Sequence, residues 1–209
     1  MKVSKGKITL DRELSELDRF VVEFTNLLEQ SGIKYVIVSG YVSILFGRAR
    51  STEDIDILIE KIEFEKFLAF LEAIKDKYWC LNTDDPKEIY SLMENANARF
   101  SKIEQVIPNI ELKFPSNMIE EIALKNKVKV VLRKKSIFIS PLELQIAYKE
   151  EVLKSKKDLE DALHLREVFK DAIDEKRIEK YKEIIKKYFY EKEENTHKRG
   201  FCQILGKLG

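Results

Sequence analysis

Cysteine and histidine are scarce in this sequence, with two residues of each among 209. The two cysteines, Cys80 and Cys202, are far apart and form no Cys-x-x-Cys pair. So few cysteines and histidines, so placed, exclude a disulfide framework and a zinc site. The simplest interpretation is that both thiols are reduced in an intracellular protein.

Long hydrophobic runs and a charge of one sign are also missing. No stretch of about eighteen apolar residues could span a bilayer, and the N-terminus lacks the apolar core of a signal peptide. We therefore expect a cytoplasmic protein with no membrane contact. The formal net charge is only +1, so overall charge favours neither nucleic acid nor a membrane surface as a partner.

Hydrophobic residues make up 44% of the chain, which is enough for a core. Their spacing predicts helices and strands between residues 11 and 140 and helices alone after that, with strands confined to 35–140. The expected helices are 11–31, 42–46, 64–75 and a short one up to 93, and the expected strands are 35–39, 55–59, 99–105, 110–114, 128–132 and 136–139. We expect 99–105 and 110–114 to be antiparallel neighbours, and 128–139 to be a basic hairpin.

These elements predict an α+β fold with a small mixed or antiparallel sheet, flanking helices and a C-terminal helical bundle. The expected domains are a core over residues 1–140, a helical region of about three helices over 141–190, and a flexible tail over 191–209.

Two aspartates one residue apart, Asp54 and Asp56, stand at the start of the expected strand 55–59. On a strand, their side chains point to the same face. Two carboxylates on one face of a buried strand repel each other and resist desolvation, and a divalent cation would neutralise them.

A turn of small residues, Ser39-Gly40, lies upstream and offers backbone N–H groups to a phosphate. A cation site beside a phosphate site indicates phosphoryl or nucleotidyl transfer. As an alternative, Ser51-x-x-Asp54 also fits a helix capping box with solvated aspartates. The alternating, isoleucine-rich sequence after Asp54 favours a strand instead.

The segment SGYVSILFGRARSTEDIDIL, residues 39–58, resembles the motif of the polymerase-beta-type nucleotidyltransferase superfamily. The closer likeness is to minimal prokaryotic members whose motif reads GGYA-x-x-x-HGRxRxTxDIDI. Ser39 departs from this motif, because it stands where the first glycine is expected. A serine can serve there unless the backbone needs a conformation that only glycine adopts easily. The resemblance implies the nucleotidyltransferase fold and its activity.

The same resemblance implies a third carboxylate on a neighbouring strand, and Glu111 is the best candidate. A surface glutamate on an edge strand is the alternative. Arg50, on the loop before the aspartates, is expected near the nucleotide because guanidinium groups suit phosphate oxygens. Its alternatives are a solvated loop and an ion pair with Asp54.

A second likeness lies in the C-terminal half. PLELQIAYK, residues 141–149, and KDLEDAL, residues 157–163, resemble the lysine and Lys/Arg-Asp-x-x-Asp segments of the same minimal transferases, including abortive-infection toxins. The likeness implies that Lys149 reaches the triphosphate and that Asp158 makes a polar contact or acts as a base. A solvated face of a lysine-rich helix is the alternative.

The sequence thus predicts a metal-dependent nucleotidyltransferase that moves an NMP from an NTP to a hydroxyl of an RNA end, a protein or a small molecule. Asp54, Asp56 and Glu111 would hold two Mg²⁺ (or Mn²⁺) ions, since oxygen ligands suit these metals. Ser39 and Gly40 would contact the phosphates, and Arg50 and Lys149 would offset their charge. The likeness to toxins implies a protein partner of toxin–antitoxin type.

Two other classes of function stay open. One is a non-catalytic module on the same fold that senses nucleotides or binds a protein partner. The other is an RNA-binding protein that uses the basic hairpin and the tail.

Overall fold

The computed structural model describes the backbone of residues 1–4 and 6–205 and their side chains as far as residue 190. It divides into two compact units, Met1–Pro141 and the helices from Leu142 onward. Among the described residues, no helix combines the length and the apolar character needed to cross a membrane. The side chains of the expected tail, 191–209, and the backbone of 206–209 lie outside the described residues.

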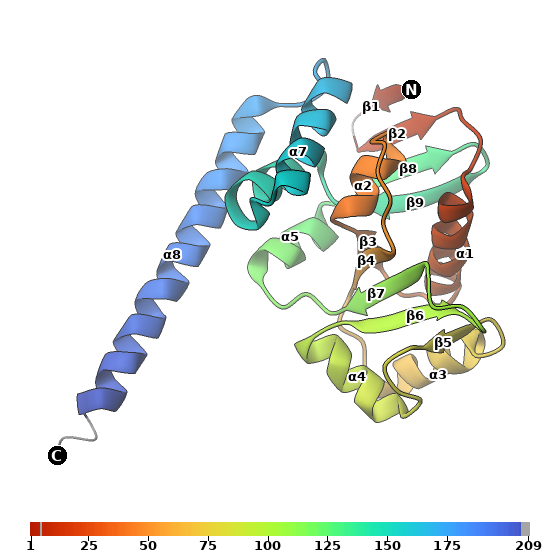
Figure 1. Ribbon diagram of the computed structural model, residues 1–209, viewed down its shortest axis with the longest axis horizontal. Coiled ribbons are helices and arrows are strands. Elements are labelled where there is room, and N and C mark those ends of the chain that lie inside the picture. Colours follow the sequence, from red (N-terminus) through yellow and green to blue (C-terminus); the bar gives the residue numbers. More distant parts are fainter. Residues whose placement is uncertain (5, 206–209) are drawn as a thin grey trace. The chain divides into compact units, whose positions relative to one another are not determined.

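The first unit is built on a mixed sheet that, in the described residues, has nine strands in the order β1-β2-β8-β9-β3-β4-β7-β6-β5 (Figure 1). Strand β4 (Asp54–Ile59) is central, antiparallel to β3 (Tyr35–Ile37) and parallel to β7 (Asn109–Lys113). Strand β6 (Ala98–Lys102) is antiparallel to β7, which confirms the predicted pairing of these two segments. The α+β class with a mixed sheet is also confirmed.

The sheet extends further toward the N-terminus than we expected. Strands β1 (Lys2–Ser4) and β2 (Lys7–Leu10) precede the first helix, so the confinement of strands to residues 35–140 is wrong. Strand β2 pairs in parallel with β8 (Val128–Leu132), the first strand of the predicted hairpin, whose second strand is β9 (Lys135–Ile139). Both N-terminal strands are too short and too polar for an apolar period to show, and β2 gains its stability from this long-range pairing.

Helix α1 (Glu16–Gln30) packs on one face of the sheet. It begins at a capping box between Ser15 and Asp18, and its buried stripe includes Phe24. The ring of Phe24 lies 6.0 Å from that of Phe100 on β6. Because neighbouring residues of a strand point to opposite faces, Arg99 points to the other face of the sheet.

The remaining short elements of the first unit complete this arrangement. Strand β5 at the sheet edge and helix α5 were not predicted, since a three-residue strand and an eight-residue helix carry too little periodicity. The bounds of these elements are α2 (Gly40–Leu45), α3 (Phe64–Ile74), β5 (Tyr78–Cys80), α4 (Pro86–Asn95) and α5 (Met118–Lys125).

The second unit consists of the helices α6 (Leu142–Tyr148), α7 (Lys156–Val168) and α8 (Glu175–Leu205), with a π-helical segment, η1 (Lys149–Leu153), after α6. The π-helical turn has no signature in the apolar spacing, and we did not predict it. Hydrogen bonds and ion pairs join these helices to one another.

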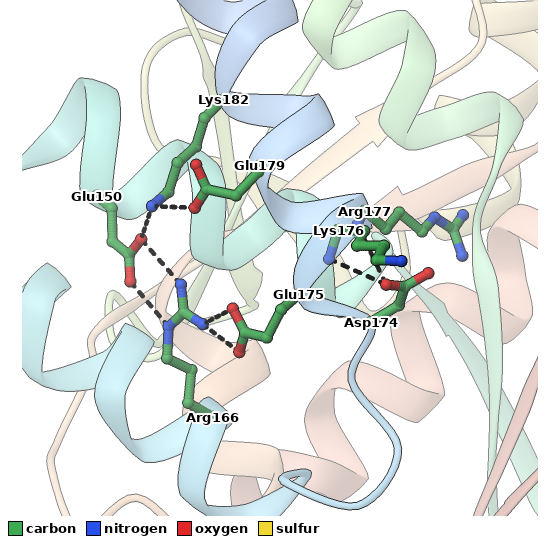
Figure 2. A network of polar contacts seen from close by, with 8 residues as sticks. All are labelled: Glu150, Arg166, Asp174, Glu175, Lys176, Arg177, Glu179 and Lys182. Atoms are coloured by element: carbon green, nitrogen blue, oxygen red, sulfur yellow. Dashed lines mark hydrogen bonds and ion pairs between the residues drawn. The ribbon is translucent and has the colours of Figure 1, made fainter.

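A polar network joins η1, α7 and α8 (Figure 2). Arg166 donates from Nε and Nη2 to the Glu150 carboxylate at 3.0 and 3.1 Å and also pairs with Glu175. Lys182 Nζ lies 2.9 Å from the Glu150 carboxylate. Burial opposes ionisation of Glu150, but the hydrogen bonds from Arg166 and Lys182 outweigh it and lower the pKa of this carboxyl. Glu150, on η1, therefore binds cations from both α7 and α8.

Candidate active site

Three carboxylates lie on one face of two parallel neighbouring strands. In the β4–β7 register, Asp56 stands beside Glu111 and Asp54 beside Asn109. The alternate residues Ile55 and Ile57 are fully buried on the opposite face. Asp54 begins a strand, so the structure excludes the helix capping box that was the alternative interpretation of this segment.

The electrostatics of Glu111 reflect this crowding. Burial raises the pKa of its carboxyl, and the negative charges of Asp56 and Asp54 raise it further. Arg99 and a hydrogen bond from Asn97 act in the opposite direction without reversing the shift. Burial and the neighbouring carboxylates therefore disfavour the ionised form of Glu111, and a bound cation would favour it.

Arg99 is a cation that the chain places at this face. It faces Glu111 across the β6–β7 pair. Its Nη2 lies 3.1 Å from Asp54 Oδ1, and its Nε lies 3.7 Å from Glu111 Oε1. Sequence reasoning missed this residue, because the predicted antiparallel pairing of the two strands did not give their register.

Two amide side chains orient the carboxylates. Asn109 is fully buried, and its Nδ2 donates to Asp54 Oδ1 at 2.7 Å. Asn97 Nδ2 donates to Glu111 Oε2 at 2.7 Å. Each carboxylate keeps a second oxygen, so these bonds fix its position and leave it able to bind a metal ion.

The donor set fits Mg²⁺ or Mn²⁺ in kind. Among the described residues, no group of three or more His, Cys, Asp or Glu side chains is drawn together closely enough to hold a metal by itself. Mg²⁺ is, however, usually bound by one or two carboxylates together with water and substrate phosphates. Asp54 and Asp56 supply two carboxylates of the required type on one face, and the residues therefore fit an ion that arrives with a nucleotide.

The turn before α2 places Ser39 in a strained conformation. Its backbone has φ +63° and ψ −138°, a region that favours glycine. The backbone at this position therefore adopts the conformation that only glycine adopts easily, and serine is unfavourable there. Such a conformation costs of order 1–3 kcal/mol, and it persists where surrounding structure imposes it, often at functional sites.

Gly40 lies against the end of the Arg50 side chain. A Cβ atom at this position would lie 2.0 Å from Nη2 of Arg50. The guanidinium of Arg50 thus lies directly against the backbone of the Ser39-Gly40 turn. The structure brings together the expected phosphate-binding turn and the arginine expected near the nucleotide.

Lys149 and Asp158 belong to the second unit and bind each other. Lys149 is fully buried, and its Nζ lies 3.2 Å from Asp158 Oδ1 and 3.0 Å from Asp161 Oδ2. The Asp158 carboxylate also accepts a hydrogen bond from the Ser155 hydroxyl, and although burial opposes ionisation, its pKa is lowered by Ser155 and Lys149. Lys149 would have to leave these carboxylates before it could contact a phosphate, and the nucleotide-binding roles of Lys149 and Asp158 stay predictions.

No protein-family model matches the chain, and no curated protein is significantly similar to it in sequence. Several solved structures are similar in fold, among them the following three. The first is an antigenic nucleotidyltransferase-like protein from Paracoccidioides brasiliensis, with a TM-score of 0.53 at 14% identity over 79% of this chain and 85% of that one. This chain has a nucleotidyltransferase fold.

The other two similar structures are transferases or resistance factors. The antibiotic-resistance factor ANT(2'')-Ia has a TM-score of 0.56 at 11% identity, covering 88% of this chain and 99% of that one. The lincosamide antibiotic adenylyltransferase LnuA, solved with lincomycin bound, has a TM-score of 0.50 at 15% identity, covering 75% of this chain and 99% of that one. The predicted nucleotidyltransferase fold is confirmed, and at these identities the activity must be argued from the site itself.

Proposed function

We propose that the chain is a metal-dependent nucleotidyltransferase that moves an NMP from an NTP to a hydroxyl acceptor. The observation that carries this proposal is the placement of Asp54, Asp56 and Glu111 on one face of β4 and β7. The close contact of Arg50 with Gly40 supports it, because this contact puts a guanidinium at the small-residue turn. Phosphoryl transfer needs carboxylates that hold a metal ion and a cationic side chain that binds phosphate oxygens. Asp54, Asp56 and Arg50 are residues of these two kinds.

Each residue has a stated role in the proposed reaction. Asp54 and Asp56 would hold Mg²⁺, with Glu111 completing the acidic face, and Arg50 would bind phosphate oxygens at the Ser39-Gly40 turn. Bound Mg²⁺ would neutralise the acids and polarise the α-phosphate and the acceptor hydroxyl. The hydroxyl oxygen would form the new bond to the α-phosphorus as the bond from this phosphorus to the bridging oxygen breaks. Pyrophosphate would leave with the electrons of the broken bond, and the hydroxyl proton would pass to solvent.

The acceptor most in keeping with the structural relatives is a small molecule. One relative is described as a lincosamide antibiotic adenylyltransferase and another as an antibiotic-resistance factor. An RNA end, a protein acceptor and a partner of toxin–antitoxin type stay predictions from the sequence.

A second candidate function is a nucleotide sensor that does not catalyse transfer. The ion pair between Arg99 and Asp54 favours it, because the chain partly neutralises its own acids. The serine that stands in place of the motif's first glycine, at a backbone φ that favours glycine, also favours a non-catalytic module. A sensor and an enzyme differ in whether label from an NTP reaches an acceptor.

The test is transfer of α-labelled NTP to candidate acceptors by the wild type and by Asp56→Asn. We expect Asp56→Asn to abolish transfer while the melting temperature is unchanged or raised, because one negative charge leaves the crowded face. Asp76→Asn, which changes an exposed aspartate on the same unit, is the matched control and should transfer at the wild-type rate. Transfer by Asp56→Asn at the wild-type rate would show that the catalytic assignment is wrong. A melting shift with Mg²⁺ and ATP but no transfer to any acceptor would identify a sensor.

A further inference from the structure

Cationic side chains are concentrated in two segments that lie far apart in the sequence. Residues 1–10 and 127–139 contain eight Lys and Arg residues and no Asp or Glu, in a chain whose formal net charge is only +1. The second segment forms the basic hairpin of β8 and β9. The parallel pairing of β2 with β8 brings the N-terminal segment beside this hairpin, so one part of the sheet collects the positive charge of both (Figure 1).

The strand registers place three lysines on one face of this part of the sheet. Lys7 stands beside Lys129 in the β2–β8 pair, and Lys2 stands beside Thr9 in the β1–β2 pair. Since alternate residues of a strand share a face, Lys7 and Thr9 point the same way, and Lys2 and Lys129 point with them. The same registers give all the residues of this basic face: Lys2, Ser4, Lys7, Thr9, Lys129, Val131, Ser136 and Phe138.

The lysines of the basic face are exposed to solvent. Among the side chains that the structure describes, none forms an ion pair with Lys2, Lys7 or Lys129. Arg133, in the turn between β8 and β9, differs from them because it is paired with Glu13. The residues that alternate with the basic face are buried on the opposite side of the sheet, among them Ile8, Val130 and Ile137. The sheet thus presents unpaired cations on one side and rests on the core with the other.

The side chains of the basic face suit the phosphates of a nucleic acid. Lysine ammonium groups and serine or threonine hydroxyl groups donate to phosphate and sugar oxygens in nucleic-acid complexes, and six of the eight residues are of these kinds. Lys7 and Lys129 stand on neighbouring strands, about 5 Å apart at the backbone. Their flexible side chains can therefore bind successive phosphates of one strand.

An anionic membrane surface fits the basic face less well. Segments that bind membrane surfaces insert apolar side chains between the lipids in addition to their electrostatic attraction. The apolar residues of this face are Val131 and Phe138, and both are partly buried. Neither protrudes beyond the lysines, so charge complementarity without apolar insertion favours a nucleic acid.

We propose that the basic face binds the phosphate backbone of a single-stranded nucleic acid. Lys2, Lys7 and Lys129 bind phosphates, and the hydroxyls of Ser4 and Thr9 donate to phosphate or sugar oxygens. Binding of this kind depends little on base sequence and weakens with salt, because the phosphates release bound cations when lysines neutralise them. It needs neither a metal ion nor an NTP, so it stands or fails separately from the proposed transfer reaction.

The test is the fluorescence anisotropy of labelled oligo(U) and oligo(dT) of about twelve nucleotides, without metal or NTP. Three neutralised phosphates predict that log K falls with log salt concentration at a slope of about −2. Lys7→Gln/Lys129→Gln should bring this slope to about −0.7 and weaken binding about tenfold or more at about 50 mM salt. Binding of either strand through these lysines supports the proposal, and tighter binding of oligo(U) identifies RNA as the ligand through its 2′-hydroxyls.

The matched control is Lys87→Gln/Lys135→Gln, which removes the same charge from the same unit. Lys87 is exposed on α4. Lys135 belongs to β9 but stands beside the buried Leu132, so it lies on the side of the sheet opposite to the basic face. This control should bind both oligonucleotides with the wild-type affinity and salt slope. Equal melting temperatures of the two double variants would show that both are folded.

Several results would overturn the proposal. One is no binding of either oligonucleotide to the wild type at about 50 mM salt. Another is equal affinity of the wild type and Lys7→Gln/Lys129→Gln. An equal loss in Lys87→Gln/Lys135→Gln would show that net charge decides binding and the basic face does not. Vesicles of phosphatidylglycerol that bind more tightly than both oligonucleotides, and less tightly to Lys7→Gln/Lys129→Gln, would overturn the assignment to a nucleic acid.

Discussion

Replacing Arg99 by methionine removes a cation that the chain places beside Asp54 and Glu111. Its guanidinium pairs with Asp54 at 3.1 Å, donates to Asn109 Oδ1 at 3.3 Å and lies 3.7 Å from Glu111. Methionine keeps much of the aliphatic length and removes the charge. After the change, three carboxylates share one face with no cation from β6.

The expected loss of stability follows from the exposure of the Arg99–Asp54 ion pair. The side chains of Arg99 and Asp54 are 41% and 44% exposed, so solvent screens their attraction. An exposed ion pair contributes about 1 kcal/mol or less, and the lost hydrogen bond and the greater carboxylate repulsion add to this. We expect the free energy of unfolding of the metal-free protein to fall by about 1–2 kcal/mol, or roughly 2–8 °C in melting temperature.

Metal affinity should change in the opposite direction. In the wild type, an incoming ion must displace the guanidinium from Asp54, and in Arg99→Met this cost disappears. The same 1–2 kcal/mol corresponds to roughly 5–30-fold tighter binding. The assay is a titration with Mn²⁺, followed by electron paramagnetic resonance of the free ion, together with thermal unfolding with and without Mn²⁺.

The matched control is Lys102→Met, which removes a cation of similar exposure from the same strand and breaks its pair with Glu23. This control should lose a little stability and keep the wild-type Mn²⁺ affinity. Mn²⁺ binding by Arg99→Met that equals or is weaker than wild-type binding would refute the reasoning, because Arg99 would then not compete with the metal.

Three further predictions concern stability. Burial and Asp56 raise the pKa of Glu111, so ionisation of its carboxyl opposes folding above the unfolded-state pKa. In urea titrations, Glu111→Gln should therefore raise the free energy of unfolding at pH 7, and this gain should shrink toward pH 4. Ser39→Gly should relax the positive φ and raise stability by about 1 kcal/mol, whereas Ser39→Ala, which keeps the strain, should leave the melting temperature near that of the wild type. Glu150→Gln should lower the free energy of unfolding by about 1–3 kcal/mol at pH 7, because Arg166 loses its anion. Since the pKa of Glu150 is lowered in the folded protein, this loss should fade as pH drops below 4.5. A loss of stability that does not depend on pH would contradict this assignment.

The acidic face was predictable from the sequence because a strand has a strict period of two. Asp54 and Asp56 on one face follow from their spacing alone, and the structure adds the register that sets Glu111 beside Asp56. Register depends on the turns and on packing across the sheet, which a single strand does not encode. For that reason Arg99 was missed, although it lies directly opposite Glu111.

Other features depend on contacts between distant segments. The strained φ of Ser39 follows from the way the chain turns from β3 into α2, and the close contact at Gly40 follows from the packing of Arg50, ten residues later. Strand β2 forms because it pairs in parallel with β8. The burial of Lys149 against Asp158 follows from a π-helical turn that apolar spacing does not signal.

The central claim is that the acids of β4 and β7 bind a catalytic divalent cation together with a nucleotide. The most direct measurement is the anomalous difference map of a crystal grown with Mn²⁺ and a non-hydrolysable ATP analogue. The account predicts a Mn²⁺ peak bonded to carboxylate oxygens of Asp54 and Asp56, with the guanidinium of Arg99 moved away from Asp54. A map with no peak at these oxygens, and with Arg99 still paired to Asp54 beside a bound nucleotide, would contradict it.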